Sequence, residues 1–384
     1  MMRSMKIFCL CVWVIIVTTI IIFSVTGCGK EEPADPVAPV VTTEMSEQTS
    51  PTISPTEEPT PTLSEFAMNP LTGIHDMDRD NTGKKSMAII INNHRAGIPQ
   101  RGISLAEMYY EYETEGGQTR LITVFADANE IPEIGSLRSA RIVSVDLAGA
   151  TESILVHFGA NQRVPDHLAT HGVERIDGNI YCASSGQSVD GHIELSGNRF
   201  FWRDDTWRQE RAIEHTAVTN AEQLLCAAEH TNLSLDGVTR VMFNFSNSSS
   251  ALDDAEVCNH LNVYFSSTNG DSIFEYDPSS NLYTKSQYGG LHIDETTGDP
   301  IQVNNVFVLF AEIEPHGDST VDIYLERGGS GYYATGGLII PIQWTKESPT
   351  SPFVFTDIDG NELEVIPGKS YINIVRSTLS EKTI

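Results

Sequence analysis

Basic residues are scarce in this sequence of 384 residues. Lys and Arg together number 24, against 52 Asp and Glu, and the formal net charge at pH 7 is −28. Such an excess of negative charge repels nucleic acids and anionic lipid surfaces. We therefore expect no nucleic-acid partner, although a local cluster of arginines remains compatible with this balance.

Cysteine is also sparse, with six residues in the whole chain. Three of them lie at or before residue 28, and the others are Cys182, Cys226 and Cys258. Three cysteines allow at most one disulfide, and the sequence does not say whether one forms. This small number suggests no metal-binding framework.

Familiar catalytic and metal-binding signatures are missing. There is no G-x-S-x-G nucleophile motif. His167 and His171 have the spacing of a helical zinc site, but Leu168 replaces the glutamate of H-E-x-x-H and no third ligand is evident. Residues 357–362 imitate the start of a calcium loop, but an Asp-Gly turn between two apolar runs explains them better. We expect no metal and no cofactor.

The N-terminus carries a targeting signal. Arg3 and Lys6 precede an apolar run over residues 7–25, followed by V-T-G-C at 25–28. This pattern is typical of a secretory signal, and the last four residues resemble the lipobox of bacterial lipoproteins. We interpret residues 1–27 as a lipoprotein signal peptide and Cys28 as the lipidated residue. The alternative is an uncleaved transmembrane anchor, since the run is about as long as a thin membrane span requires. Both alternatives place the rest of the chain outside the cytoplasm.

Three segments follow the signal. Residues 28–66 are rich in Pro, Thr and Glu and have no periodic apolar face, which predicts a disordered tether. At about 3.1 Å per residue, such a chain reaches on the order of 100 Å. Residues 67–234 are predicted to form an N-terminal α+β domain, and residues 235–384, with many short strands, a β-rich C-terminal domain. The expected fold is α+β: a mixed, largely antiparallel sheet with helices in the first half, packed against a mainly β second half.

Within the first half, an apolar run predicts a strand over 87–92, and helices are expected near 139–148, 162–170 and 219–230. The segment 105–147 is the most informative. Glutamates at 111, 113 and 115 alternate with tyrosines, and Gly116-Gly117 suits a two-residue hairpin turn before a strand over 119–125. In that register Arg120 points to the glutamate face.

Two arginines follow in S-L-R-S-A-R. Arg138 and Arg141 are three apart and share a face if this segment opens a helix. The charges either neutralise one another between layers of the fold or converge on an anionic ligand, since a guanidinium group binds carboxylate or phosphate at two points. We expect Arg138 to be structural and Arg141 to face a cleft.

Several longer motifs resemble one family. In the first half these motifs are N-P-L-T-G, A-I-I-I-N-N, Y-E-Y-E-T-E-G-G-Q-T-R, I-G-S-L-R-S-A-R, V-H-F-G and F-W-R-D, and in the second half they are G-G-L-H-I-D-E-T-T-G and I-P-I-Q-W-T-K. Together they resemble the YerB-like family of bacterial lipoproteins. The resemblance covers nearly all of residues 69–370 and implies an extracytoplasmic α+β protein with two domains of unknown function (DUF3048). One departure is E-H-T-A-V-T around His215, where the family pattern is P-H-N-L-Y-T.

Candidate site residues come from these motifs and from the charge pattern. In the N-terminal half the candidate ligand-binding residues are Glu115, Arg120, Arg138, Arg141, His157, Arg203, Asp204, Arg211 and His215. In the C-terminal half they are His292 and Asp294. No catalytic residue can be assigned.

We expect a lipoprotein held to the membrane through Cys28 that binds an anionic envelope ligand: a wall phosphate polymer, a peptidoglycan carboxylate or an acidic sugar. One alternative is an envelope hydrolase or transferase that uses His157 or His215 with Asp204 or Glu115. The other is a scaffold for protein partners of unknown identity, in which the charges are purely structural.

Overall fold

A computed structural model describes residues 66–181 and 199–383 of the chain. The predicted signal peptide, Cys28, the predicted tether up to residue 65 and Cys182 lie outside the described residues. No helix of the described residues is long and apolar enough to cross a membrane. Cys226 and Cys258 are free thiols in this structure.

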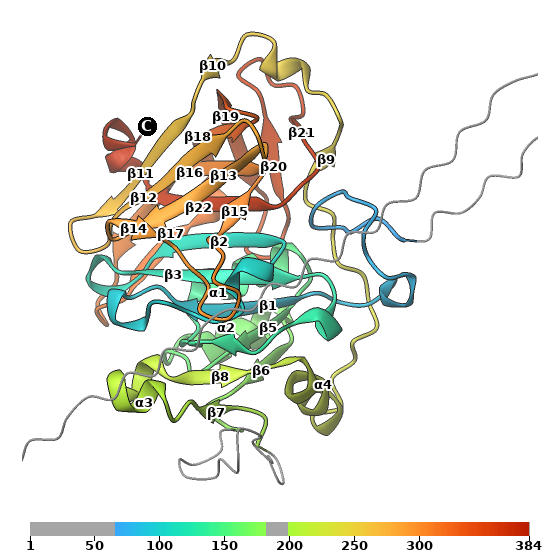
Figure 1. The fold of residues 1–384 in the computed structure, drawn as a ribbon, viewed down its shortest axis with the longest axis vertical. Helices are drawn as coiled ribbons and strands as arrows, with labels where there is room; N and C mark the ends of the chain where they lie inside the picture. The colour runs from blue at the N-terminus through green and yellow to red at the C-terminus, as the bar shows by residue number, and fades with distance from the viewer. Residues whose placement is uncertain (1–65, 182–198, 384) are drawn as a thin grey trace, which may run out of the picture. The chain divides into compact units, whose positions relative to one another are not determined.

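A large mixed sheet runs through the described structure (Figure 1). Its neighbouring strands are, in order, β10 (Glu256–Val257), β19 (Leu338–Lys346), β18 (Gly329–Thr335), β16 (Asn305–Pro315), β22 (Ser370–Arg376), β2 (Met108–Glu113), β3 (Thr119–Phe125), β1 (Met87–Asn92), β5 (Ile154–His157) and β6 (Arg175–Asp177). Two further strands, β17 (Val321–Tyr324) and β20 (Phe353–Thr356), pair with β16 and β19.

The two halves of the chain meet at the centre of this sheet. Strand β22 pairs in parallel with β2, from Met108 opposite Ser370 to Tyr112 opposite Ile374. The boundary at residues 234/235 stays a prediction, but the halves on either side of it share one continuous sheet. The N-terminal half therefore positions its side chains on a framework that the C-terminal half completes.

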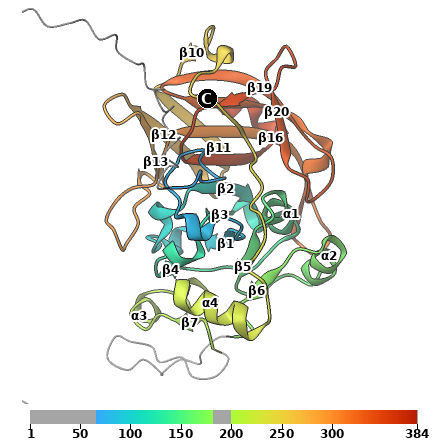
Figure 2. The same cartoon turned by 90° about the vertical axis from the view of Figure 1, so that its right-hand side faces the viewer.

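Both faces of the central strands are covered, which explains why β1, β2 and β3 are buried along their whole length. Tyr110 and Tyr112 of β2 share one core with helix α1 (Ile142–Ala150), which lies beside α2 (Val164–His171) (Figure 2). Tyr109 points to the other face. There it shares a core with Phe274 from a second sheet and with the residues of α4 (Ala221–His230).

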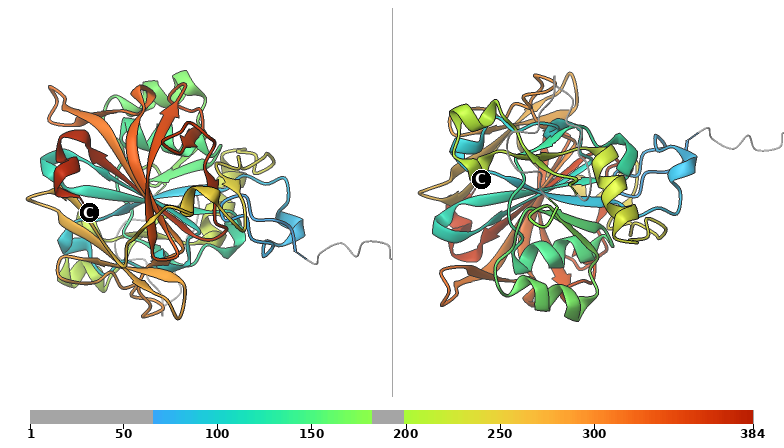
Figure 3. Two further views of the ribbon diagram at one scale, coloured as in Figure 1. Left: turned by 90° about the horizontal axis from the view of Figure 1, so that it is seen from above. Right: turned by 90° about the horizontal axis from the view of Figure 1, so that it is seen from below.

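The second sheet is antiparallel and comes entirely from the C-terminal half. It consists of β11 (His260–Ser266), β12 (Gly270–Asp277), β13 (Leu282–Gln287), β14 (Gly290–Leu291) and β15 (Gln302–Val303), visible in gold and orange in Figure 3. Its Phe274 ring meets the ring of Tyr371 on β22 edge to face, with 5.0 Å between centroids. The predicted α+β fold with a mainly β second half is confirmed.

Smaller elements complete the structure. A three-stranded sheet contains β4 (Ile134–Gly135), β8 (Ala217–Thr219) and β7 (Trp202–Arg203), followed by the short helix α3 (Trp207–Glu210). Strand β21 (Glu364–Val365) pairs with β9 (Asn244–Phe245). The predicted strand over 87–92 coincides with β1, and α2 and α4 begin two residues later than expected.

The hairpin between β2 and β3 has a longer turn than predicted. Residues 114–118 form the loop, with a 3-10 turn over Glu115–Gly117, so Glu113 pairs with Thr119 and Tyr112 with Arg120. Gly116 and Gly117 take the positive φ values expected of them, 66° and 74°. A change of one residue in register moves every side chain to the opposite face. Arg120 therefore lies on the tyrosine face, away from Glu111 and Glu113.

Candidate functional site

The altered register brings charged side chains of several predicted motifs together beside the start of α1. We call this group the arginine cluster: Arg120, Arg138, Arg141 and Arg203, with Glu115 and Glu214. Four cations face two carboxylates here, in a chain whose formal net charge is −28. The formal charge of the cluster is therefore positive, opposite in sign to the charge of the whole protein.

Glu115 in the hairpin loop holds two of these arginines. Its carboxylate forms an ion pair with Nε of Arg141 and lies 3.7 Å from Nη2 of Arg120. The Arg120 side chain is only 7% exposed, and its Nη1 donates to the carbonyl of Ser139 at 2.6 Å. Burial, and then the nearby charge of Arg141, lower the pKa of Arg120 to about 10. One carboxylate therefore only partly compensates two closely placed cations.

Arg138 has unused hydrogen-bonding capacity. Its Nη1 donates to the carbonyl of Glu214 at 3.1 Å, while its buried Nε has no partner among the described residues. Burial lowers the pKa of this guanidinium group. The expected division of roles is therefore reversed: Arg141 is paired with the hairpin, and Arg138 faces a cleft.

The reversal has a local cause. Helix α1 begins at Ile142 rather than at residue 139, and Arg141 is the extended N-cap residue. The Ser144 hydroxyl accepts from the backbone N–H of Arg141 and donates to its carbonyl, which fixes this helix start. Arg138 thus precedes the helix in extended chain, so the two arginines do not share a helix face.

A pocket of about 260 Å³ opens beside Arg138, and we call it the arginine pocket. Arg203 lies across it with its guanidinium carbon 4.2 Å from the centroid of the Phe158 ring, and it donates from Nη1 to the carbonyl of Ile213. The lining residues are Leu137, Arg138, Ser139, Phe158, Gly159, Ala160, Asn179, Arg203 and Glu214.

Gly159 lines this pocket in a backbone conformation that favours glycine. Its φ of +76° disfavours any other residue, and a Cβ at this position would lie 3.4 Å from the Ser139 hydroxyl oxygen and 4.0 Å from Cβ of Asn179. Ser139, Asn179 and Glu214 were not among the predicted site residues. Two features of the sequence could have pointed to this pocket: the V-H-F-G motif, and the position of Glu214 directly before His215.

The two histidines of the cluster region do not form acid–base pairs. His157 is 1% exposed, and its Nδ1 donates to the carbonyl of Gly159 at 2.8 Å. Its contact with Asp177 is 3.7 Å, too long for a hydrogen bond. Burial lowers the pKa of His157, and the hydrogen bond of its ring ends on Gly159, a residue that lines the pocket.

His215 lies next to the cluster, where it stacks on His94 with 5.1 Å between ring centroids. Its Nδ1 accepts from the side-chain amide of Asn92 at 2.7 Å rather than contacting a carboxylate. Burial, and then the charge of Arg138, lower its pKa. The geometry of these two histidines therefore gives no support to the hydrolase or transferase alternative.

Sequence and structure comparisons agree with this architecture. The profile of the N-terminal domain of "Protein of unknown function (DUF3048)" matches residues 71–234, and the profile of the C-terminal domain matches residues 261–372. The chain belongs to the DUF3048 family.

A curated relative from Bacillus subtilis (strain 168), described as "Putative lipoprotein YerB", is 29% identical over 313 residues, covering 80% of this chain and 85% of the relative. The crystal structure of the YerB protein from Bacillus subtilis is similar with a TM-score of 0.67 and 27% identity, covering 80% of this chain and 95% of that chain. The resemblance read from the motifs is confirmed.

Two predicted site residues of the DUF3048 N-terminal domain lie in a different assembly, which we call the tryptophan clamp. Arg101 and Arg211 stack on the Trp207 ring, with their guanidinium carbons 4.2 and 4.3 Å from its centroid. Asp204 binds Arg101 at 2.7 Å, and Glu295 binds Arg101 at 3.0 Å. These charges are paired, so Asp204 and Arg211 have structural roles.

The C-terminal candidates are also structural. His292 is buried, accepts at Nδ1 from Lys285 and donates from Nε2 to Gln100 at 2.9 Å. Asp294 is buried and accepts hydrogen bonds from the backbone N–H groups of Gly102 and Ser104. Both residues fix the loop at residues 100–104 of the N-terminal half, and neither lines the arginine pocket.

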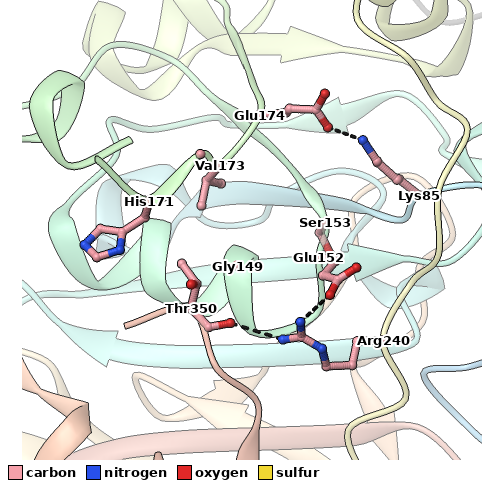
Figure 4. Close-up of a pocket in the computed structure, with 10 residues that line it drawn as sticks. Lys85, Gly149, Glu152, Ser153, His171, Val173, Glu174, Arg240 and Thr350 are labelled. Atoms are coloured by element: carbon pink, nitrogen blue, oxygen red, sulfur yellow. Dashed lines mark hydrogen bonds and ion pairs between the residues drawn. The ribbon is translucent and has the colours of Figure 1, made fainter. Parts of the chain in front are cut away.

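A second pocket of about 300 Å³ lies near the C-terminal ends of α1 and α2 (Figure 4). The Lys and Arg side chains that line this pocket already have partners within the protein. Lys85 pairs with Glu174, and Arg240 pairs with Glu152 and donates to the carbonyl of Thr350. Helix C-termini carry negative partial charge. This pocket is therefore a poorer anion site than the arginine pocket.

The histidine pair with helical metal-site spacing has other partners. His167 Nε2 is 2.6 Å from the buried carboxylate of Asp146, and His171 packs against the His167 ring at 4.4 Å between centroids. No group of three or more His, Cys, Asp or Glu arranged to hold a metal ion occurs within residues 66–181 and 199–383.

Proposed function

We propose that this DUF3048 protein is a membrane-anchored extracytoplasmic lipoprotein that binds an anionic envelope ligand in the arginine pocket. The observation that carries this proposal is the concentration of positive charge at one cleft of an acidic protein. Arg138 and Arg203 line the cleft, and Arg120 and Arg141 are near enough to interact electrostatically with Arg138.

The energetic argument rests on Arg138. A buried N–H donor without an acceptor is costly, and a charge-assisted hydrogen bond to an anion removes that cost. The anion also reduces the repulsion among the guanidinium groups: the charges of Arg141 and Arg138 lower the pKa of Arg120, and the charge of Arg141 lowers the pKa of Arg138. Binding therefore gains both a hydrogen bond and relief of like-charge repulsion.

The size of the pocket limits the ligand. A volume of about 260 Å³ suits a single phosphate- or carboxylate-bearing unit rather than a long stretch of polymer. Ser139 and Asn179 supply neutral polar groups, and Glu214 can accept from a ligand hydroxyl. A terminal or repeating unit of a wall phosphate polymer, a peptidoglycan carboxylate or an acidic sugar meets these requirements.

Calorimetric titration of the full chain in detergent with inorganic phosphate and with glycerol phosphate tests this site. We expect Arg138→Gln to weaken binding by about tenfold or more, because it removes a charge-assisted hydrogen bond. Arg208→Gln is the matched control, since Arg208 is an exposed residue that pairs with Asp205. Failure of the wild type to bind either anion, or equal affinities of the two variants, would contradict the proposal.

Anchoring rests on the V-T-G-C sequence and on the description of the Bacillus subtilis relative as a lipoprotein. We expect Cys28→Ala to abolish labelling by a palmitate analogue, because the thiol that accepts the lipid is lost. Cys226→Ala is the control and should label normally. Labelling of the Cys28→Ala protein would show that the lipobox interpretation is wrong.

A further inference from the structure

A fully buried lysine lies between the main sheet and the five-stranded sheet. Lys285 on β13 and Glu111 on β2 both have side chains that are 0% exposed, and their Nζ and Oε2 atoms are 3.5 Å apart. An ammonium ion in such a place is costly, and burial lowers the pKa of Lys285. The neutral amine, which is a nucleophile, is therefore easier to form here than on the protein surface.

The side-chain amide of Asn93, the residue directly after β1, contacts Glu111 of this pair. Its Nδ2 is 3.0 Å from Oε1 of Glu111 and 3.1 Å from Oε1 of Gln287, and the same Gln287 oxygen is 2.7 Å from Nζ of Lys285. The Lys285 amine and the Asn93 amide therefore both contact Oε1 of Gln287, and both lie beside the Glu111 carboxylate. Oδ1 of Asn93 and Nε2 of Gln287 are buried without a partner among the described residues.

We propose that Lys285 and Asn93 become joined by an intramolecular isopeptide bond, with Glu111 as the proton carrier. This places a covalent cross-link between the first strand of the N-terminal half and the second sheet. The proposal is independent of anion binding in the arginine pocket, which involves none of these residues.

The reaction begins when Glu111 takes a proton from the Lys285 ammonium. The free amine attacks Cγ of Asn93, and negative charge develops on the amide oxygen. The amide keeps its orientation, so the leaving nitrogen Nδ2 stays 3.0 Å from Oε1 of Glu111 and 2.7 Å from the Thr119 hydroxyl oxygen.

Glu111 then gives its proton to the departing nitrogen, the bond between Cγ and that nitrogen breaks, and a second proton from Nζ also passes through Glu111. An ammonium group and a primary amide are thus converted into a secondary amide and a free ammonium ion. Glu111 begins and ends as a carboxylate, and no oxidant or other reactant is needed.

Two further observations support these roles. Glu111 is held in place by hydroxyl donors, with Ser272 at 2.9 Å and Tyr371 at 2.7 Å from Oε2. The Tyr371 ring also covers Lys285, with Nζ 5.5 Å from its centroid. These side chains are buried, so water is kept from the intermediate.

Asn93 is a better acceptor than Gln287, although the Gln287 oxygen is closer to Nζ. The leaving nitrogen must receive a proton, and Nδ2 of Asn93 is already beside Glu111. Nε2 of Gln287 has no hydrogen-bond partner that meets the usual geometry among the described residues, and no contact with Glu111. Gln287 also lies only two residues from Lys285 on the same strand, where a link would close a small, strained ring.

Mass spectrometry of the purified wild-type chain tests the proposal. The expected intact mass is lower than the processed sequence requires by one ammonia molecule, and digestion should yield a branched peptide that joins residues 93 and 285. An intact mass that matches the sequence would overturn the proposal, as would a branch that ends at Gln287.

Two variants separate the chemistry from the packing. Lys285→Arg keeps the positive charge but lacks the nucleophilic amine, and Glu111→Gln keeps the shape of the proton carrier without its basicity. We expect both to have the uncorrected sequence mass. Loss of ammonia in Lys285→Arg would overturn the proposal, and the wild-type measurement decides the question even if neither variant folds.

Discussion

Trp207→Ala is expected to lower the free energy of unfolding by about 3–5 kcal/mol, the usual cost of removing a buried aromatic side chain. Trp207 is 1% exposed and separates two guanidinium groups, those of Arg101 and Arg211. Its Nε1 also donates to Glu295 at 2.8 Å, which ties α3 to the C-terminal half. Without the ring, both guanidinium groups lose their stacking surface, and a cavity remains.

Trp207→Phe is the matched control for this prediction. It keeps an aromatic surface for both guanidinium groups but loses the hydrogen bond to Glu295 and part of the buried ring, so we expect a loss of about 1–2 kcal/mol. Urea denaturation followed by circular dichroism gives both values. Similar losses for the two variants would mean that the stacked ring does not hold this region together.

Glu115→Gln is expected to lower the free energy of unfolding by about 1–3 kcal/mol. Breaking a fully buried pair costs about 3–5 kcal/mol, and we reduce this because the Glu115 side chain is 31% exposed and solvent screens it. The loss arises because Arg120 and Arg141 would then repel each other without a carboxylate between them.

This variant also links stability to anion binding. Added phosphate should restore part of the stability of Glu115→Gln and should stabilise it more than the wild type, since the uncompensated positive charge is larger. Glu152→Gln is a suitable control, because Glu152 pairs with Arg240 in the second pocket. Thermal melts at constant ionic strength measure the effect, and equal responses to phosphate in both variants would contradict the account.

The sequence predicts those features of the fold that depend on local pattern. Strand β1 has a short apolar run in which all six residues are buried, and its limits follow directly from that run. The α+β class follows from the strand-rich second half and the helical patterns of the first. The pairing of β2 with β22 joins residues more than 250 positions apart, and local pattern carries no information about such a pairing.

The face on which Arg120 lies could not be predicted, because two adjacent glycines do not determine the length of the turn around them. The loop begins at Thr114 rather than at Gly116, and that change moves Arg120 from the side of Glu113 to the side of Tyr112. The position of Arg138 was missed for a similar reason, since Ser144 fixes the helix start three residues further along than the charge spacing suggested.

Some of the predicted site residues lie in the arginine cluster, and their role in ligand binding stays a prediction. Glu115, Arg120, Arg138, Arg141 and Arg203 come together, and His157 donates a hydrogen bond to Gly159 of the pocket lining. The partners that give Asp204, Arg211, His292 and Asp294 structural roles come from distant segments of the chain, such as Gln100 and Arg101. Charge alone cannot distinguish a paired arginine from one that faces a cleft, because the distinction depends on those distant partners.

The most direct test of the central claim is a crystal structure of the protein grown with glycerol phosphate at low salt. The account predicts density for the phosphate group in the arginine pocket, within hydrogen-bonding distance of Nε of Arg138 and of the Arg203 guanidinium group. An empty pocket in crystals of a protein shown to bind glycerol phosphate in solution, with the ligand bound elsewhere, would contradict it.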